Sequence, residues 1–425
     1  MLEAYPAAPA RQGRRRWWIL AAALTVQVTV SIILQGYPAL VPFVKRDLHL
    51  SLAQAGVFAS IPGLGMALGV LAAAWAVDRT GDRHVLTWGG LATGLLALLT
   101  AFSPTYSLLL VASIAVGVGA ATPTPAGSRA VLAEFPHRQR GIVMSVRQTG
   151  VPVGGFIAAI ALPLIAVHLG WRTALGVAGA SAVLGSIACM VCYRIAGPTQ
   201  EAVRVAAEQT VSFFTLLNRN LLKIGGSGIV LVMGQYCLVT YVVLFLNHTR
   251  GLPLVLASFF LAATQLAGSA GRIFWGWFSD RVVGGSRRAA LMVVSFVGAA
   301  GVLMLAWLPA QAPFALVVIA VLIAGCSVVG WNGVWVTMLA EVAPPGLQAR
   351  SIAAGLTLNQ PAILVGPWAF GLFVDATGSY QLAWTGLAAL LIGAGWLITR
   401  ASEAPDGGVG ETDRGAVGDD RRQWR

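Results

Sequence analysis

Long apolar stretches fill most of this chain, and they constrain its fold more than any single motif does. A helix needs about 20 apolar residues to cross a bilayer, and it satisfies its backbone hydrogen bonds internally, as lipid requires. Only 10% of the residues are charged, whereas soluble domains carry about 25%. We predict an all-α membrane protein with twelve transmembrane helices, at about 17–44, 53–77, 85–102, 107–133, 142–167, 173–194, 222–247, 254–278, 289–309, 313–340, 351–374 and 381–400.

One long polar interruption divides the predicted helices into six and six. It covers residues 195–221 and contains Gly197-Pro198. The sequence therefore predicts two six-helix bundles within five regions. These are a basic N-terminal arm (1–16), a first bundle (17–194), a linker (195–221), a second bundle (222–400) and a disordered tail (401–425), with the arm, linker and tail cytoplasmic.

Two short motifs occur twice, at nearly the same interval. Asp78-Arg79 follows a Trp-containing helix end, and Asp280-Arg281 follows another about 200 residues later. Leu132-Ala133-Glu134 recurs as Leu339-Ala340-Glu341 at a similar spacing. Two motifs repeating at one period indicate internal duplication, which is the architecture of many secondary transporters. We therefore predict that the two bundles are pseudo-symmetric.

The basic residues are distributed unevenly over the predicted loops. The formal net charge is +12, but one alternate set of loops holds only Lys45, Arg46, Arg172 and Arg250. Such asymmetry follows the positive-inside rule and predicts cytoplasmic termini in a multi-pass protein of the inner (plasma) membrane. It also excludes nucleic acid as the partner, because the cationic arm is explained as an anchor on lipid headgroups.

The sequence predicts no enzyme, no metal site and no cofactor. The predicted helices hold no His, Asp or Glu away from their ends, whereas catalysis needs a nucleophile with a base or a metal. Cys189 and Cys192 form a C-x-x-C pattern inside a helix, without a second pair. Apolar packing is the simpler explanation of these cysteines.

The segment around Asp78 resembles the loop between helices two and three of the major facilitator superfamily. Asp78, Arg79, Gly81, Arg83 and Leu86 match that signature, and Ala74, Ala76 and Asp82 depart from it. A weaker copy lies at Gly276, Asp280 and Arg281, where the superfamily repeats the signature. The resemblance implies twelve helices and a secondary active transporter that works by alternating access. It does not identify the substrate, since the superfamily carries many kinds.

We predict that the charged residues at the cytoplasmic helix ends form a gate. A carboxylate there can pair with arginines or with the positive N-terminus of a neighbouring helix, and so clasp the bundles together. A static helix-end anchor is the alternative. The predicted gating residues are Asp78, Arg79, Gly81, Arg83, Asp280, Arg281, Glu134 and Arg129.

Three arginines, Arg129, Arg147 and Arg272, fall within predicted helices, where no acid accompanies them. Burying a charge in the membrane is costly and usually functional, so the missing negative charge is expected from the substrate. Arg129 lies near enough to Glu134 to reach the cytoplasmic rim. Arg147 either lines the cavity or braces the gate. Arg272 shares one helix face with Gln265 and Ser269 and is the foremost candidate for an anion ligand.

A narrower resemblance supports the choice of Arg272. It is similar to the substrate arginine of monocarboxylate transporters and of the oxalate–formate antiporter, and the antiporter's aromatic pair and glutamine resemble Trp331, Trp335 and Gln35. Asn359-Gln360 stands where the antiporter has a lysine, which favours a monocarboxylate over a dicarboxylate. The predicted substrate-binding residues are Arg272, Arg147, Gln35, Gln27, Tyr236, Gln265, Trp331, Trp335, Asn359 and Gln360.

Other interpretations stay open. Polar residues also join transmembrane helices by hydrogen bonds without binding substrate. A drug or metabolite efflux permease of the same superfamily is one alternative function, and a transporter-like sensor is another. In each case we predict a monomer that binds a small molecule, which we expect to be anionic.

Overall fold

A computed structural model describes residues 10–196, 219–309, 311–343 and 347–403 of the chain. These residues form helices and no strand. The N-terminal helices are α1 (Ala10–Asp47), α2 (Leu52–Thr80), α3 (Asp82–Thr100), α4 (Tyr106–Ala120), α5 (Pro123–Glu134), α6 (His137–Gln148) and α7 (Gly150–Ala196). The C-terminal helices are α9 (Arg219–Arg250), α10 (Leu254–Arg281), α11 (Arg287–Trp307), α12 (Phe314–Ala324), the π-helical turn η1 (Gly325–Val329), α13 (Asn332–Glu341), α14 (Gln348–Thr377) and α15 (Tyr380–Thr399).

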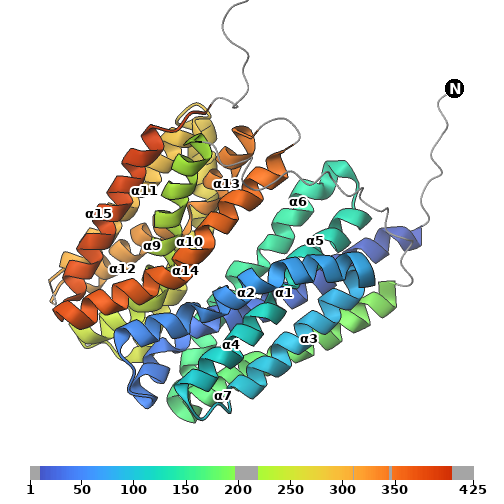
Figure 1. Ribbon diagram of the computed structural model, residues 1–425, viewed down its shortest axis with the longest axis horizontal. Helices are drawn as coiled ribbons and strands as arrows, with labels where there is room; N and C mark the ends of the chain where they lie inside the picture. The colour runs from blue at the N-terminus through green and yellow to red at the C-terminus, as the bar shows by residue number, and fades with distance from the viewer. Residues whose placement is uncertain (1–9, 197–218, 310, 344–346, 404–425) are drawn as a thin grey trace, which may run out of the picture.

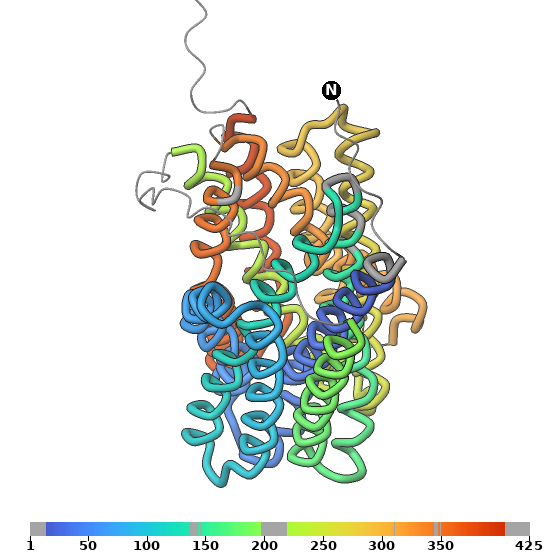
Figure 2. Tube along the Cα trace, turned by 90° about the vertical axis from the view of Figure 1, so that its right-hand side faces the viewer, coloured from blue at the N-terminus to red at the C-terminus, as the bar shows by residue number. Residues whose placement is uncertain are grey.

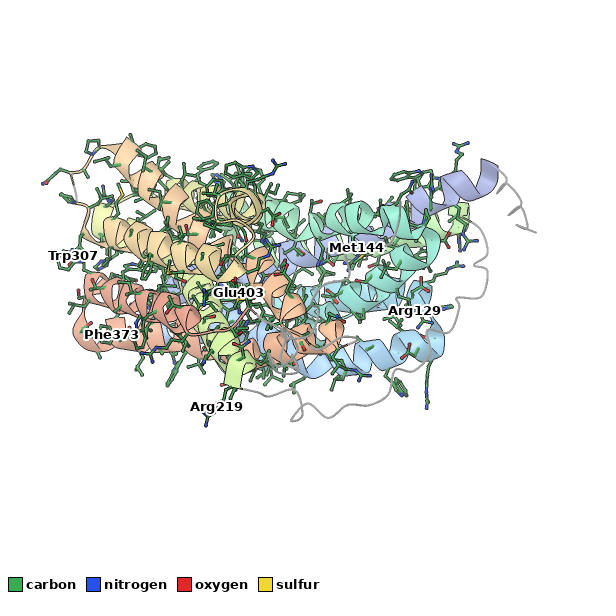
Figure 3. The ribbon with its side chains drawn as sticks, turned by 90° about the horizontal axis from the view of Figure 1, so that it is seen from above. Arg129, Met144, Arg219, Trp307, Phe373 and Glu403 are labelled. Carbon is green, nitrogen blue, oxygen red and sulfur yellow. The ribbon has the colours of Figure 1, made fainter. Side chains whose placement is uncertain are left out.

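The helices gather into two sets that follow chain order. In Figure 1 the helices α9–α15 lie on one side and α1–α7 on the other. Figure 2 shows the same helices, turned by 90°, running alongside one another. From above, the labels Arg129 and Met144 lie over one set, and Trp307 and Phe373 over the other (Figure 3). We refer to α1–α7 as the N-terminal helices and to α9–α15 as the C-terminal helices.

The prediction of an all-helical membrane protein is confirmed. Within the described residues, nine helical segments are long and apolar enough to cross a bilayer. One of them, Val146–Ala196, contains a break at Gly170, whose φ of 84° is a backbone conformation that glycine adopts easily. The count of twelve crossings stays a prediction.

Several boundaries differ from those predicted. Helix α1 begins at Ala10, inside the predicted N-terminal arm. The predicted helix 107–133 is interrupted between α4 and α5, where Pro123 begins the new helix, because proline lacks the N–H that a continuous helix needs. Most of the predicted linker and nearly all of the predicted tail lie outside the described residues, so the division into five regions stays a prediction.

The two sets of helices are joined by a seam at one end of α2. The backbone N–H groups of Leu52 and Ala53, in the first turn of α2, donate to the Asp375 carboxylate of α14 at 2.9 and 2.8 Å. The Tyr241 hydroxyl of α9 contacts the carbonyl oxygens of Leu52 and Pro367 at 2.8 and 2.7 Å. A carboxylate at a helix N-terminus is favoured by the free N–H groups and by the helix dipole. We call these contacts the α2–α14 seam.

Candidate functional site

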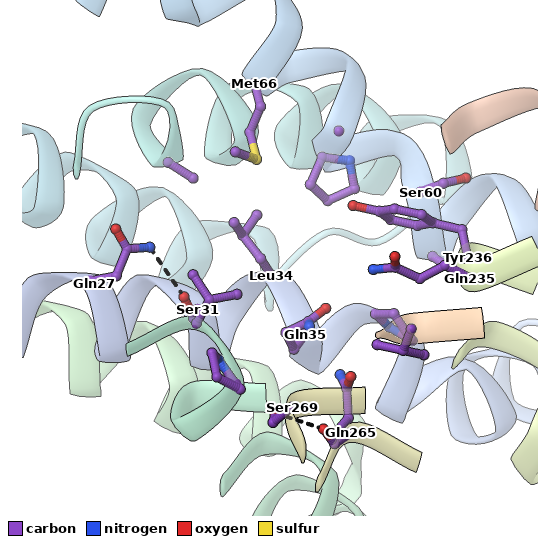
Figure 4. A pocket seen from close by; sticks show the side chains of 18 of the residues that line it. Gln27, Ser31, Leu34, Gln35, Ser60, Met66, Gln235, Tyr236, Gln265 and Ser269 are labelled. Carbon is purple, nitrogen blue, oxygen red and sulfur yellow. Dashed lines mark hydrogen bonds between the residues drawn. The ribbon is translucent and has the colours of Figure 1, made fainter. Parts of the chain in front are cut away.

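A cavity of about 270 Å³ lies between the N-terminal and C-terminal helices. Its walls come from α1, α2, α4, α5 and α7 on one side, and from α9, α10 and η1 on the other. Figure 4 shows polar side chains from these helices converging on it. The polar residues that line it are Gln27, Ser31, Gln35, Ser60, Thr124, Gln235, Tyr236, Gln265, Ser269 and Arg272.

Five of the ten predicted substrate-binding residues line this cavity together. They are Gln27, Gln35, Tyr236, Gln265 and Arg272, and they come from helices α1, α9 and α10. Glycine allows the close approach that brings two of them together. A Cβ at Gly155 of α7 would lie only 3.1 Å from the Gln265 amide nitrogen and 3.3 Å from that of Gln35. A larger residue there would crowd both amides.

Arg272 is the charged residue of the cavity wall. Its side chain is half-buried, and within the described chain its guanidinium makes no hydrogen bond or ion pair. The residues that line the cavity include no acid. The arginine is held in place by its helix, because a Cβ at Gly268 or Gly271 of α10 would collide with Val329 or with the Cys326 carbonyl of the facing segment. The small residues therefore let α10 pack closely and fix the base of the Arg272 side chain.

Arg147 does not line the cavity. It is fully buried, and its Nη2 donates to the carbonyl oxygens of Pro123 (2.8 Å) and Thr124 (3.2 Å) and to Gln27 Oε1 (3.2 Å). These acceptors lie at the start of α5 and on α1. Of the two interpretations left open by the sequence, the geometry matches a brace between helices rather than a direct ligand.

The two tryptophans also lie outside the cavity wall. Both are fully buried. Trp331 Nε1 donates to Gln235 Oε1 at 3.1 Å, and Trp335 Nε1 donates to the carbonyl oxygen of Ile224 at 2.9 Å. The π-helical turn η1 precedes them and adds a residue to its turn, which rotates the following helix relative to a regular one. Val329 of this turn is the residue that reaches the cavity.

Asn359 and Gln360 of α14 are likewise absent from the cavity wall. Asn359 is buried, and its Oδ1 makes no hydrogen bond within the described residues. Gln360 is half-buried. Both predicted ligands belong to a helix that contributes no residue to this cavity.

Residues on α2 contribute to the cavity although they are absent from the predicted set. Ser60 and Met66 both line it. The Ser60 hydroxyl donates to the Gly56 carbonyl at 2.7 Å, so its oxygen can still accept a hydrogen bond from a ligand. The signal available in the sequence was a serine two residues before Pro62-Gly63, inside a largely apolar helix.

The predicted gating acids all form ion pairs, each within one set of helices. Asp78 pairs with Arg129 at 2.8 Å, and Glu134 pairs with Arg15 at 2.9 Å. In the C-terminal helices Arg287 pairs with both Asp280 and Glu341. The motifs that repeat in the sequence thus recur as carboxylate–arginine pairs. A clasp between the two sets stays a prediction.

The remaining gating candidates surround the helix ends. Gly81 joins α2 to α3 with a φ of 82°, which explains a glycine at this position. The Arg79 guanidinium lies 4.4 Å from the centre of the Trp75 ring, and that of Arg83 lies 5.8 Å from Tyr193. Arg281 is exposed.

A comparison with protein families identifies the superfamily to which the chain belongs. The sequence pattern of the Major Facilitator Superfamily matches residues 17–367. The chain belongs to this superfamily. It is therefore a membrane protein of a transporter family and not an enzyme, as we predicted from the sequence.

Relatives and solved structures agree with this membership. An MFS-type transporter of Mycobacterium tuberculosis, Rv2994, is 28% identical over 87% of this chain and 81% of its own. The probable sulfoacetate transporter SauU of Cupriavidus necator is 24% identical over 84% and 87% of the two chains. The membrane sensor protein UhpC of Escherichia coli is 22% identical over 68% and 70%.

The structure of a bacterial homolog of the human lysosomal transporter Spinster, in its inward-facing and occupied conformation, superposes with a TM-score of 0.78. It covers 92% of this chain and 97% of its own, at 16% identity. At that identity the likeness describes the fold alone.

Proposed function

We propose that this superfamily member is a secondary active transporter of a small organic anion, of the monocarboxylate type, that works by alternating access. The observation that carries the proposal is Arg272, a cation on the cavity wall with no acid among the lining residues. Placing a charge within a membrane protein costs several kcal/mol unless a partner compensates it. An anionic substrate would supply that partner each time it binds.

The type of cation supports a carboxylate as the ligand. The guanidinium of Arg272 is planar and can meet the two oxygens of a carboxylate with two parallel hydrogen bonds. Amide and hydroxyl groups surround it, including Gln265 and Ser269 on the same helix. One charged group with several neutral polar groups suits a monoanion better than a dianion.

The relatives give partial support. The name of SauU describes a probable carrier of sulfoacetate. Sulfoacetate has a sulfonate and a carboxylate, so this relative supports an organic anion but not the preference for a monoanion. UhpC is described as a sensor, so its similarity favours the second candidate function, a transporter-like sensor that binds its ligand without net transport. A permease for lipophilic cations has less support, because a cationic substrate needs an acidic partner and the residues that line the cavity include no acid.

The orientation belongs to the same proposal. The uneven distribution of basic residues supports cytoplasmic termini and a place in the inner membrane. In that orientation the α2–α14 seam lies on the periplasmic side, and the Asp78 and Asp280 helix ends lie on the cytoplasmic side. We further propose that a monomer is the working unit.

The proposal is tested by measuring ligand binding to the purified protein. A panel of monocarboxylates, dicarboxylates, sulfonates and lipophilic cations is screened by thermal shift, and hits are quantified by calorimetry. We expect monocarboxylates to bind, Arg272→Gln to lose about 10²-fold in affinity or more, and Arg272→Lys to weaken binding strongly, since unpairing a buried charge costs about 3–5 kcal/mol.

The matched control is Arg194→Gln, which removes an exposed arginine of α7 that makes no bond within the described residues. Its affinity should equal that of the wild type. Binding of cations without anions, or unchanged anion affinity in Arg272→Gln, would contradict the proposal.

A further inference from the structure

Two glutamines that line the cavity have amide oxygens that already accept a hydrogen bond from a residue outside the cavity wall. Gln235 Oε1 accepts a hydrogen bond from Trp331 Nε1 at 3.1 Å. Gln27 Oε1 accepts one from Arg147 Nη2 at 3.2 Å. Neither donor residue lines the cavity, whereas both glutamines do.

The orientation of these two amides follows from the chemistry of their partners. An amide oxygen and nitrogen are hard to distinguish by shape alone, and their assignment rests on the hydrogen-bond network. An indole N–H and a guanidinium N–H can only donate. Each glutamine must therefore turn its oxygen toward its buried partner, because the opposite orientation would place two donors against each other.

The amide nitrogens are then left for the cavity. Figure 4 shows the Gln235 amide reaching into it, and the Gln27 amide directed toward Ser31. The Gln27 Nε2–Ser31 Oγ distance is 3.4 Å, a long contact that a ligand oxygen could replace. With Arg272, the wall thus presents three groups fixed as hydrogen-bond donors.

Gln35 and Gln265 differ from this pair. Their side-chain amides make no hydrogen bond within the described residues, so either end can face a ligand. Ser60 and Ser269 each donate to a carbonyl of their own helix, which leaves oxygen lone pairs for the cavity. The Gln27 and Gln235 amide nitrogens and the Arg272 guanidinium therefore form a part of the wall that can only donate. A ligand group placed there has to accept a hydrogen bond.

We infer that the substrate is an anion with a second hydrogen-bond acceptor, such as an oxo oxygen, and that Trp331 and Arg147 are positioning residues that select it. The inference rests on the proposed function, since it concerns the same site. The carboxylate would meet Arg272, and the second acceptor would meet the Gln235 amide N–H. An ammonium group in that place would face a donor, and the two would be left unsatisfied.

The test compares acids that differ in this one group. Straight-chain 2-oxo acids and the 2-amino acids of equal chain length, from three to six carbons, are titrated against the purified full-length protein by calorimetry. We expect each oxo acid to bind about tenfold more tightly than the amino acid of equal length. The amino acid loses the hydrogen bond to the Gln235 amide and places its ammonium group against that donor.

Two variants connect this preference to the tryptophan. Trp331→Phe removes the indole N–H and frees the Gln235 amide to rotate, so the ratio of oxo-acid to amino-acid affinity should fall toward one. Gln235→Met removes the donor at similar length and should lower the ratio as well, which keeps the test informative if Trp331→Phe folds poorly. The matched control is Trp384→Phe, which removes another fully buried indole, in a helix that gives no residue to the cavity.

The possible results distinguish failure of the inference from failure of the proposed function. A ratio near one in the wild type, or a ratio unchanged in both Trp331→Phe and Gln235→Met, overturns the inference. Binding of other monocarboxylates with no binding of any oxo acid also overturns it, while the proposed function stands. Failure of every anion in both panels contradicts the proposed function itself.

Discussion

At the scale of single residues, two arginines within membrane-protein helices, Arg147 of α6 and Arg272 of α10, differ in their partners. Arg147 is fully buried and donates to two backbone carbonyls and a glutamine. Arg272 makes no hydrogen bond within the described residues and faces a cavity. Hydrogen bonds to groups of other helices let a buried arginine join those helices, whereas a guanidinium that makes no hydrogen bond is available for a ligand. We therefore propose that Arg147 braces the helices and that Arg272 binds the anion.

A residue-scale prediction concerns the gate. The Asp78 side chain is 78% exposed in its pair with Arg129, and exposed pairs contribute about 0–1 kcal/mol to stability. Asp78→Asn should therefore leave the melting temperature nearly unchanged. If Asp78 also acts in gating, turnover should fall while substrate affinity stays similar.

Thermal unfolding and transport assays on the same preparation measure both quantities. The comparison variant is Asp82→Asn, because Asp82 begins α3 close to Asp78 in the chain and accepts a hydrogen bond from the Tyr193 hydroxyl within the N-terminal helices. Normal turnover in Asp78→Asn would leave the residue only as a helix-end anchor.

Part of the site could be predicted from residue spacing, and part could not. Gln265, Ser269 and Arg272 lie on one face because helical periodicity places them there, and the structure finds all three at the cavity. The role of Arg147 depends on carbonyls of α5 that are distant in sequence. No local pattern indicates such partners.

At the scale of elements, the α2–α14 seam joins the two sets of helices through specific hydrogen bonds. One carboxylate accepts from two N–H groups of α2, and one hydroxyl contacts carbonyls of α2 and α14. Glycines permit this approach, since a Cβ at Gly56 or Gly371 would collide with the Tyr241 hydroxyl and with backbone atoms across the seam. Alternating access would require this seam to separate.

The element-scale prediction is that Asp375→Ala loosens the seam. Two charge-assisted hydrogen bonds are lost, and about 1–2 kcal/mol would shift the population of the separated state by about tenfold. Spin labels at Ser107 and Gln381, both exposed and on opposite sets of helices, report the distance between them. We expect a larger share of long distances in the variant.

The control for this measurement is Ser379→Ala. It removes a helix cap within the C-terminal helices, where Ser379 Oγ accepts from the Leu382 N–H at 3.3 Å, and it leaves the seam intact. An unchanged distance distribution in Asp375→Ala would mean that the carboxylate only caps α2.

The same scale explains why the Trp331 and Trp335 prediction missed the cavity wall. Their spacing of one helical turn predicts a shared face, and the sequence does not show that a π-helical turn precedes them. That turn packs against α10, where a Cβ at Gly268 or Gly271 would collide with it. Such a departure from regular geometry depends on the partner helix.

At the scale of the whole molecule, the long apolar stretches and the Asp78 motif were sufficient to predict the fold class and the family. Each long apolar run has to become a helix in lipid, so the sequence predicts helices with little ambiguity. Internal repeats predicted that one charged motif occurs in both sets of helices, and in the structure Asp78 pairs with Arg129 and Asp280 with Arg287. Substrate specificity was less predictable, because it depends on which side chains of eight separate segments meet at one cavity.

The central claim is that the molecule transports an anion through Arg272, and uptake into liposomes tests it most directly. Wild-type protein is reconstituted beside Arg272→Gln, Arg272→Lys and the exposed control Arg194→Gln, and the influx of a radiolabelled monocarboxylate that binds the purified protein is measured. We expect influx with the wild type and Arg194→Gln, strongly slowed influx with Arg272→Lys, and none with Arg272→Gln. Wild-type influx through Arg272→Gln, or a wild-type protein that carries only cations, would contradict the account.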